Sequence, residues 1–163
     1  MTGTKMEPKV VHATFVVERS FSKPASVVFA ALSEPDEIRR WMGGSQHSEL
    51  FEFSCEFREG GMQFLRYKMG PKTPIAGAVI TNEGRFQQIV PDERIVAAAT
   101  MRMGDHIFSA SQVTFELVPT GQGTDLILTH QGAFFEGSDG PAMREEGWNV
   151  LMDNLVRVVN TGQ

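Results

Sequence analysis

The sequence predicts an α+β domain, in which a curved antiparallel sheet wraps around one long C-terminal helix. Strand-like alternation of apolar and polar residues recurs along most of the chain, and short turns separate the segments that carry it. The regular strand–helix–strand alternation of a parallel sheet does not occur. The last segment instead repeats apolar residues at helical spacing, and its roughly 19 residues, at about 1.5 Å each, can cross a whole sheet.

The N-terminal part predicts one strand followed by two short helices. Apolar and polar residues alternate over residues 10–21, which is the period of a strand. Pro24 fits the first turn of a helix, and the residues behind it carry an apolar stripe. Pro35 begins a second short helix, which Gly43-Gly44 ends.

Six further strands are expected before the last helix. The first has the clearest pattern, because alternate residues on one face are Phe51, Phe53, Cys55 and Phe57. A shift of one residue would bury the charged residues between them, so the register of this strand is well specified. Gly60-Gly61 then turns the chain, and the other strands are expected at residues 62–69, 78–90, 94–103, 107–118 and 124–132.

The last helix begins at Pro141 and has one apolar face. That face carries Trp148, Leu151, Met152, Leu155, Val158 and Val159. A sheet curled around such a helix cannot always fill its interior with side chains. We therefore expect the space left over to form a cavity.

Charge and composition limit the class of function. The net charge is −5, whereas nucleic-acid binding needs a clustered basic face, so we expect no nucleic acid and no membrane as partners. No apolar run is long enough for a membrane span, and residues 1–9 lack the apolar run of a signal peptide. The expectation is a cytoplasmic protein with a flexible leader at residues 1–9 and a single domain at residues 10–161. Because Cys55 is the only cysteine and the histidines are far apart, neither a disulfide nor a metal or other cofactor is expected.

Several short segments occur in the order typical of a known superfamily. They include Glu18-Arg19-Ser20-Phe21, Phe57-Arg58-Glu59-Gly60-Gly61, Pro91-Asp92-Glu93-Arg94 and Glu145-Glu146-Gly147-Trp148. On these segments the chain resembles the START-like superfamily, also called SRPBCC or birch-pollen-allergen-like, and within it the branch homologous to activators of the heat-shock-protein ATPase. The resemblance implies the helix-grip fold. It also implies a range of functions, since members bind lipids, hormones or polyketides and some are cyclases.

Seven residues are candidates for contact with a ligand: Trp41, Phe64, Arg66, Met101, His130, Trp148 and Met152. His130 lies in phase with Leu126 and Leu128, so its imidazole is expected to face the helix. An inward imidazole costs a few kcal/mol unless it is hydrogen-bonded. It could orient a ligand or donate a proton, or it could be a structural histidine with a partner inside the protein.

Four of the other candidates also have two interpretations each. Trp148 is either a wall of the cavity or a clamp between helix and sheet, and Trp41 lies either at the lip of the cavity or in the core. Arg66 would anchor an anionic group if it points inward, and otherwise lies on the sheet surface. The pattern around Met101 does not decide between the cavity and the outer face.

Three functions remain open from the sequence. The favoured one is binding of a small hydrophobic or amphipathic molecule, because the sequence lacks the dense set of titratable groups typical of enzyme sites. The alternatives are an enzyme of the polyketide cyclase or lyase type and a chaperone-associated interaction module of the stress response. A homodimer through the sheet edge or the helices is compatible with the pattern. A cavity below roughly 300 Å³ would count against a ligand of drug size.

Overall fold

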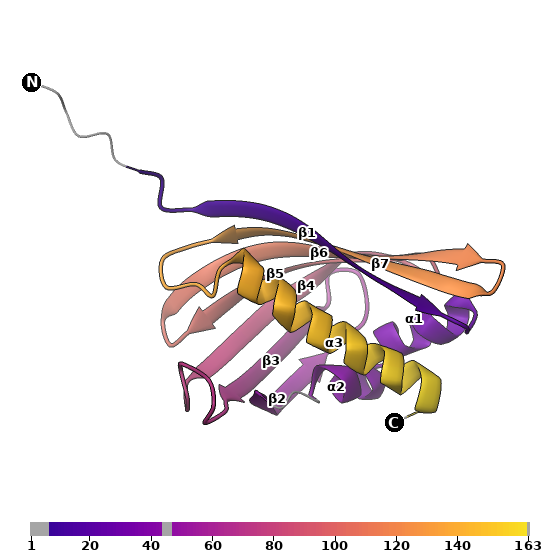
Figure 1. Cartoon of the computed structure of the whole chain (residues 1–163), viewed down its shortest axis with the longest axis horizontal. Coiled ribbons are helices and arrows are strands. Elements are labelled where there is room, and N and C mark those ends of the chain that lie inside the picture. The colour runs from indigo at the N-terminus through magenta and orange to yellow at the C-terminus, as the bar shows by residue number, and fades with distance from the viewer. Residues whose placement is uncertain (1–6, 44–46, 163) are drawn as a thin grey trace, which may run out of the picture.

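The chain folds into one antiparallel sheet and three helices over residues 7–43 and 47–162, which the computed structural model describes (Figure 1). In chain order these are β1 (Val11–Phe21), α1 (Ala25–Ser33), α2 (Pro35–Met42), β2 (Ser48–Cys55), β3 (Met62–Met69), β4 (Val79–Val90), β5 (Arg94–Met103), β6 (His106–Thr120), β7 (Gly123–Phe134) and α3 (Pro141–Thr161). The expected leader falls mostly on residues 1–6, outside the described residues. Within the described ranges no helix combines the length and the apolar character needed to cross a membrane.

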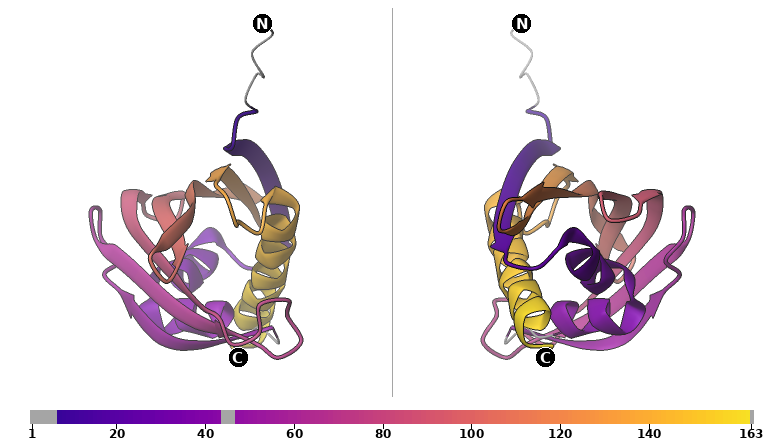
Figure 2. Two further views of the ribbon diagram at one scale, coloured as in Figure 1. Left: turned by 90° about the vertical axis from the view of Figure 1, so that its left-hand side faces the viewer. Right: turned by 90° about the vertical axis from the view of Figure 1, so that its right-hand side faces the viewer.

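The sheet contains seven strands in the order β1-β7-β6-β5-β4-β3-β2, and every neighbouring pair is antiparallel. Its pairing register shifts in three places, between Leu50 and Glu52, between Phe86 and Gln88, and between Met101 and Arg102. Such irregularities bend the strand and increase its twist. The sheet is accordingly strongly curved, and α3 lies across the side that the strands leave open (Figure 2). The predicted helix-grip fold is confirmed.

The core lies between the concave face of the sheet and the apolar face of α3. Met152 and Leu155 of α3 are fully buried, as are Leu126 and Leu128 of β7. Helix α3 also packs against β1 and against the short helices α1 and α2. Burying one side chain of this size contributes about 1.5–3 kcal/mol. The buried apolar residues of α3 therefore hold this helix against the sheet.

One strand departs from its predicted pattern. Phe53 and Cys55 are half-buried as expected, but Phe51 is 47% exposed. Phe51 falls at the register shift between Leu50 and Glu52, so the strict alternation of the strand is interrupted there. A bulge changes which face the next side chain occupies, and the expectation that Phe51 joins the inner face is therefore wrong.

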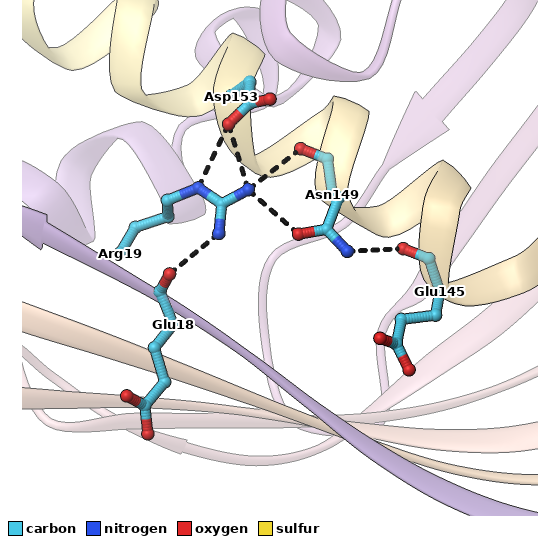
Figure 3. Close-up of polar contacts among 5 residues, drawn as sticks. All are labelled: Glu18, Arg19, Glu145, Asn149 and Asp153. Atoms are coloured by element: carbon cyan, nitrogen blue, oxygen red, sulfur yellow. Dashed lines mark hydrogen bonds and ion pairs between the residues drawn. The ribbon is translucent and has the colours of Figure 1, made fainter. Parts of the chain in front are cut away.

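Arg19 fastens β1 to α3 through a polar cluster (Figure 3). Its Nε and Nη2 atoms donate to Oδ1 of Asp153 at 3.1 and 2.9 Å, and Nη2 also donates to Oδ1 of Asn149 at 3.0 Å. Asn149 in turn donates from Nδ2 to the carbonyl oxygen of Glu145 at 3.0 Å. One guanidinium group thus joins the edge strand to two successive turns of the helix.

We expect Arg19→Met to lower the free energy of unfolding by about 1 kcal/mol, because the Asp153 partner is 70% exposed and water replaces much of the lost interaction. Urea denaturation measures the change. Arg58→Met is the matched control, since its ion pair with Glu56 is exposed on both sides and joins only neighbouring residues, so it should change stability by less than about 0.5 kcal/mol. Equal effects of the two substitutions would mean that Arg19 does not fasten β1 to α3.

Candidate ligand-binding cavity

A cavity of about 80 Å³ lies between the sheet and the helices. Its walls come from all three helices and from strands β3 to β7. Most of the lining is apolar, and the polar residues in it are Gln63, Asn82, Ser111, His130 and Arg144. The interior is therefore neither filled completely nor as open as expected. Large rings account for the small volume, because Trp41, Phe86, Phe115 and Trp148 all project into this space.

Four of the seven candidate residues line this cavity: Trp41, Met101, His130 and Trp148. Phe64, Arg66 and Met152 do not. On β3 the cavity is lined by Gln63 and Leu65, so Phe64 and Arg66 point to the other face of the sheet. Arg66 there donates to the carboxylate of Glu52 at 3.3 Å and to the hydroxyl of Thr81 at 3.4 Å. Met152 is fully buried in the core.

Both tryptophans combine packing with a place in the cavity wall. Trp41 is only 2% exposed, so it lies inside the molecule and not at a lip. Its Nε1 atom donates to the carbonyl oxygen of Ala31 at 3.0 Å. Trp148 is half-buried, and both indole rings meet the Phe115 ring edge to face, at centroid distances of 6.5 Å for Trp41 and 6.1 Å for Trp148. The three rings form one rigid aromatic wall.

His130 is held between two phenylalanine rings. Its imidazole is stacked on Phe15 at a centroid distance of 4.6 Å and an angle of 5°, and Phe134 lies 6.1 Å away. Gly132, between His130 and Phe134 on β7, makes room for both rings, since a β-carbon there would lie 2.9 Å from Cε1 of His130. The inward direction predicted for His130 is therefore correct.

The residue His130 is only 1% exposed, and its Nδ1 atom is buried without a hydrogen-bond partner. It is the one such side-chain atom among the described residues. Leaving a buried polar atom unpaired costs about 1–3 kcal/mol. An atom of this kind at a cavity wall is a place where a ligand atom would recover that energy.

Burial lowers the pKa of His130 from 6.5 to about 4, and the positive charge of Arg144 acts in the same direction. The polar backbone of His130 itself and the charge of Asp139 oppose the shift of the pKa without reversing it. The imidazole is therefore neutral at pH 7. A neutral imidazole offers one hydrogen-bond donor and one acceptor, so His130 is suited to orienting a polar group. It carries no extra proton that it could transfer to a substrate as an acid.

Arg144 is the cavity residue that the sequence interpretation missed. It lies in the second turn of α3, and its side chain is only 8% exposed. Nε donates to Oδ2 of Asp139 at 2.7 Å, while Nη2 donates to Oδ1 of Asp139 at 2.8 Å and to the hydroxyl of Ser109 at 2.9 Å. The guanidinium also lies 5.1 Å from the centre of the Phe134 ring. A signal was present in the sequence, because Arg144 precedes Trp148 by four residues and so shares its helix face.

Arg144 influences the pKa values of two neighbouring groups, Asp139 and Tyr67. Burial alone would raise the pKa of Asp139, but the hydrogen bond and charge of Arg144 outweigh burial and lower it. Burial raises the pKa of Tyr67 on β3, while the charges of Arg144 and Asp139 act on it in opposite directions. The hydroxyl of Tyr67 therefore stays protonated. The Arg144–Asp139 pair is thus fully ionised at pH 7 and carries no net charge.

The described residues include neither an activated thiol nor a cluster of metal ligands. Burial, and then the charge of Glu56, raises the pKa of Cys55 to about 11, so this thiol is not a nucleophile at neutral pH. No three His, Cys, Asp or Glu side chains within residues 7–43 and 47–162 come close enough together to hold a metal ion. The cavity with its polar lining residues, among them His130 and Arg144, is therefore the principal chemical feature of the described part of the chain.

We expect His130→Phe to remove part of the acid sensitivity of the fold. Between about pH 6.5 and about pH 4 the unfolded chain binds a proton at His130 that the folded chain does not, so wild-type stability falls as the pH drops through this window. The loss is on the order of 3 kcal/mol, at about 1.4 kcal/mol per pKa unit. Urea denaturation at several pH values would measure it. Carboxylates titrate equally in both proteins, so parallel pH profiles would show that His130 does not contribute.

Comparison with known proteins agrees with this architecture. Residues 22–160 match the family model described as Activator of Hsp90 ATPase homolog 1-like protein. The chain belongs to this family. The resemblance drawn from the sequence segments is thereby confirmed. Membership of the Activator of Hsp90 ATPase homolog 1-like family supports, in general terms, a ligand-binding or chaperone-associated module.

Solved structures show the same fold along almost the whole chain. A protein from Rhizobium loti is 39% identical, with a TM-score of 0.80 over 91% of this chain and 97% of that one. A protein from Rhizobium leguminosarum is 28% identical, with a TM-score of 0.82 over 93% and 96%. An AHSA1-like protein from Aeromonas hydrophila, 21% identical with a TM-score of 0.67 over 92% and 94%, shares the fold. No curated protein matches the sequence.

Proposed function

We propose that this chain binds a small molecule, mostly apolar and with one polar group, in the cavity between α3 and the sheet. The observation that carries the proposal is the buried, unpaired Nδ1 atom of His130, a residue in the wall of a mostly apolar space. Aromatic rings on two sides hold this atom in place without satisfying it. A ligand that fills the apolar space restores the packing contacts that the cavity lacks, and a polar atom on it that reaches Nδ1 supplies the missing hydrogen bond.

The cavity volume limits the size of the ligand. At about 80 Å³ it is well below the roughly 300 Å³ of a pocket for a drug-sized molecule, which counts against such a ligand in this conformation. It is also below the roughly 150 Å³ of a cavity that takes benzene. The ligand is therefore a very small molecule, or the walls move to admit it. Met42 and Met101 in the lining are half-buried, and flexible methionine side chains suit such adjustment.

Native mass spectrometry of the freshly purified protein tests the proposal directly, because a retained ligand reveals its own mass. We expect a bound species that is lost on denaturation and that quenches or shifts the tryptophan fluorescence when it is added back. Both tryptophans of the chain line the cavity, so the fluorescence reports on this site alone. A ligand-free spectrum, together with unchanged fluorescence across a library of small apolar compounds, would refute the proposal.

The family description gives a second candidate, association with a chaperone ATPase. Co-purification of the tagged protein with an Hsp90-type chaperone, and a change in the ATPase rate of that chaperone, would support it. Retention of a small molecule without any bound chaperone would instead favour cavity binding. An enzymatic role of the cyclase or lyase type would require His130 to transfer a proton, for which its lowered pKa is poorly suited at neutral pH.

A further inference from the structure

Two nitrogen atoms of residues that line the cavity have unused hydrogen-bonding capacity. The first is Nδ1 of His130. The second is Nη1 of Arg144, because Nε and Nη2 make all the hydrogen bonds of this guanidinium within the described residues. Both side chains line the cavity, and both pack against the Phe134 ring, the imidazole at 6.1 Å and the guanidinium at 5.1 Å. They therefore form one polar end.

The charge at this polar end is already balanced. Asp139 accepts two hydrogen bonds from Arg144, at 2.7 and 2.8 Å, and neutralises it. A carboxylate ligand would place a second negative charge beside Asp139 in a poorly solvated site, and like charges at short range oppose ionisation strongly. An ammonium group would face the same penalty from Arg144. The neighbouring Tyr67 and His130 are neutral at pH 7 and compensate neither charge.

From this arrangement we infer that the cavity selects a neutral carbonyl compound over a carboxylate or an amine. The carbonyl oxygen accepts a hydrogen bond from Nη1 of Arg144, and the alkyl part lies against Trp148 and Met101. Nδ1 of His130 serves the same oxygen or a hydroxyl on the adjacent carbon, according to its tautomer. The inference rests on the proposed binding function and specifies the class of ligand.

Four probes of nearly equal size and shape separate the alternatives. They are 2-butanone, its hydrocarbon analogue 2-methyl-1-butene, its carboxylate analogue propanoate, and sec-butylamine. Titrations followed by the NMR signals of the two tryptophan indole N–H groups, both in the cavity wall, give the four affinities. For the wild-type protein we expect butanone to bind at least roughly 10-fold more tightly than propanoate and the amine.

Two variants assign the selectivity to named atoms. Arg144→Lys keeps a cation beside Asp139 but removes Nη1, so the butanone affinity relative to the hydrocarbon should fall roughly 10-fold or more, as for a lost hydrogen bond to a charged donor. Asp139→Asn removes the compensating charge, so propanoate should gain roughly 10-fold or more while butanone changes little. If Arg144→Lys does not fold, as judged by circular dichroism, Asp139→Asn alone still decides the question.

The outcomes distinguish the inference from the function on which it rests. If propanoate binds most tightly to the wild-type protein, or if Asp139→Asn leaves its affinity unchanged, the inference is overturned while the cavity remains a binding site. An unchanged ratio of butanone to hydrocarbon in Arg144→Lys would also overturn it. If none of the probes moves either indole signal, the proposed function itself fails.

Discussion

Replacing Arg144 with methionine is expected to lower the free energy of unfolding by about 4 kcal/mol, as is typical when one partner of a buried ion pair is removed. Three hydrogen bonds are lost, and Ser109, which is 1% exposed, keeps no partner for its hydroxyl. Asp139 becomes an unpaired carboxylate that is only partly solvated. Methionine keeps the apolar stem but not the guanidinium group, so the space that this group leaves adds to the loss of polar contacts. Urea denaturation at pH 7 measures it.

The double variant Arg144→Met with Asp139→Asn provides the matched control. Because it leaves neither charge buried, it should recover roughly half of the stability that the single substitution loses. A loss below about 1 kcal/mol in Arg144→Met would show that water solvates the pair as it solvates an exposed ion pair. If the loss in the double variant equals the sum of the losses in Arg144→Met and in Asp139→Asn, the two residues are not coupled.

Trp41→Ala is expected to destabilise the fold by about 4 kcal/mol and to enlarge the cavity at the same time. The ring is almost completely buried, and the Nε1 hydrogen bond to Ala31 disappears with it. Since Trp41 lines the cavity, the removed ring adds its own volume to the existing space. Larger apolar compounds that the wild-type protein excludes, such as benzene, should then bind. Thermal denaturation with and without benzene measures both effects in one experiment.

Trp41→Phe is the control for this prediction, because it keeps a ring but removes the hydrogen bond and part of the volume. It should lose about 1–2 kcal/mol and gain little affinity for benzene. If benzene stabilises Trp41→Ala no more than the wild type, the wall has collapsed into the space and the cavity is not maintained by this tryptophan.

The sequence predicts the fold well because local patterns determine most of it. Strand alternation, turn residues such as Gly60-Gly61 and the apolar face after Pro141 each gave an element whose ends differ by only a few residues from the observed ones. The exception is Phe51. A bulge depends on how a strand pairs with its neighbour, and the sequence of one strand does not contain that information.

The candidate site is only partly predictable for the same reason. Facing direction follows from periodicity, so His130 and Trp148 could be placed at the interior. The pattern around Met101 left its direction open, and the structure places it in the cavity lining. The choice between Arg66 and Arg144 could not be made in this way. Arg144 is buried only because Asp139 and Ser109, from a loop and from β6, meet it in three dimensions. A buried cation depends on partners that lie far along the chain, and a helical spacing of four residues from Trp148 was the only local sign of it.

The cavity wall at His130 depends on Gly132, which does not itself line the cavity. Any larger residue there would press on the imidazole of His130, and Phe15, stacked on that ring, restricts its retreat. The same β-carbon would lie 2.9 Å from the Phe134 ring, so both aromatic neighbours of Gly132 would have to shift. A single methyl group at position 132 would therefore disturb the cavity wall without replacing any residue that lines the cavity.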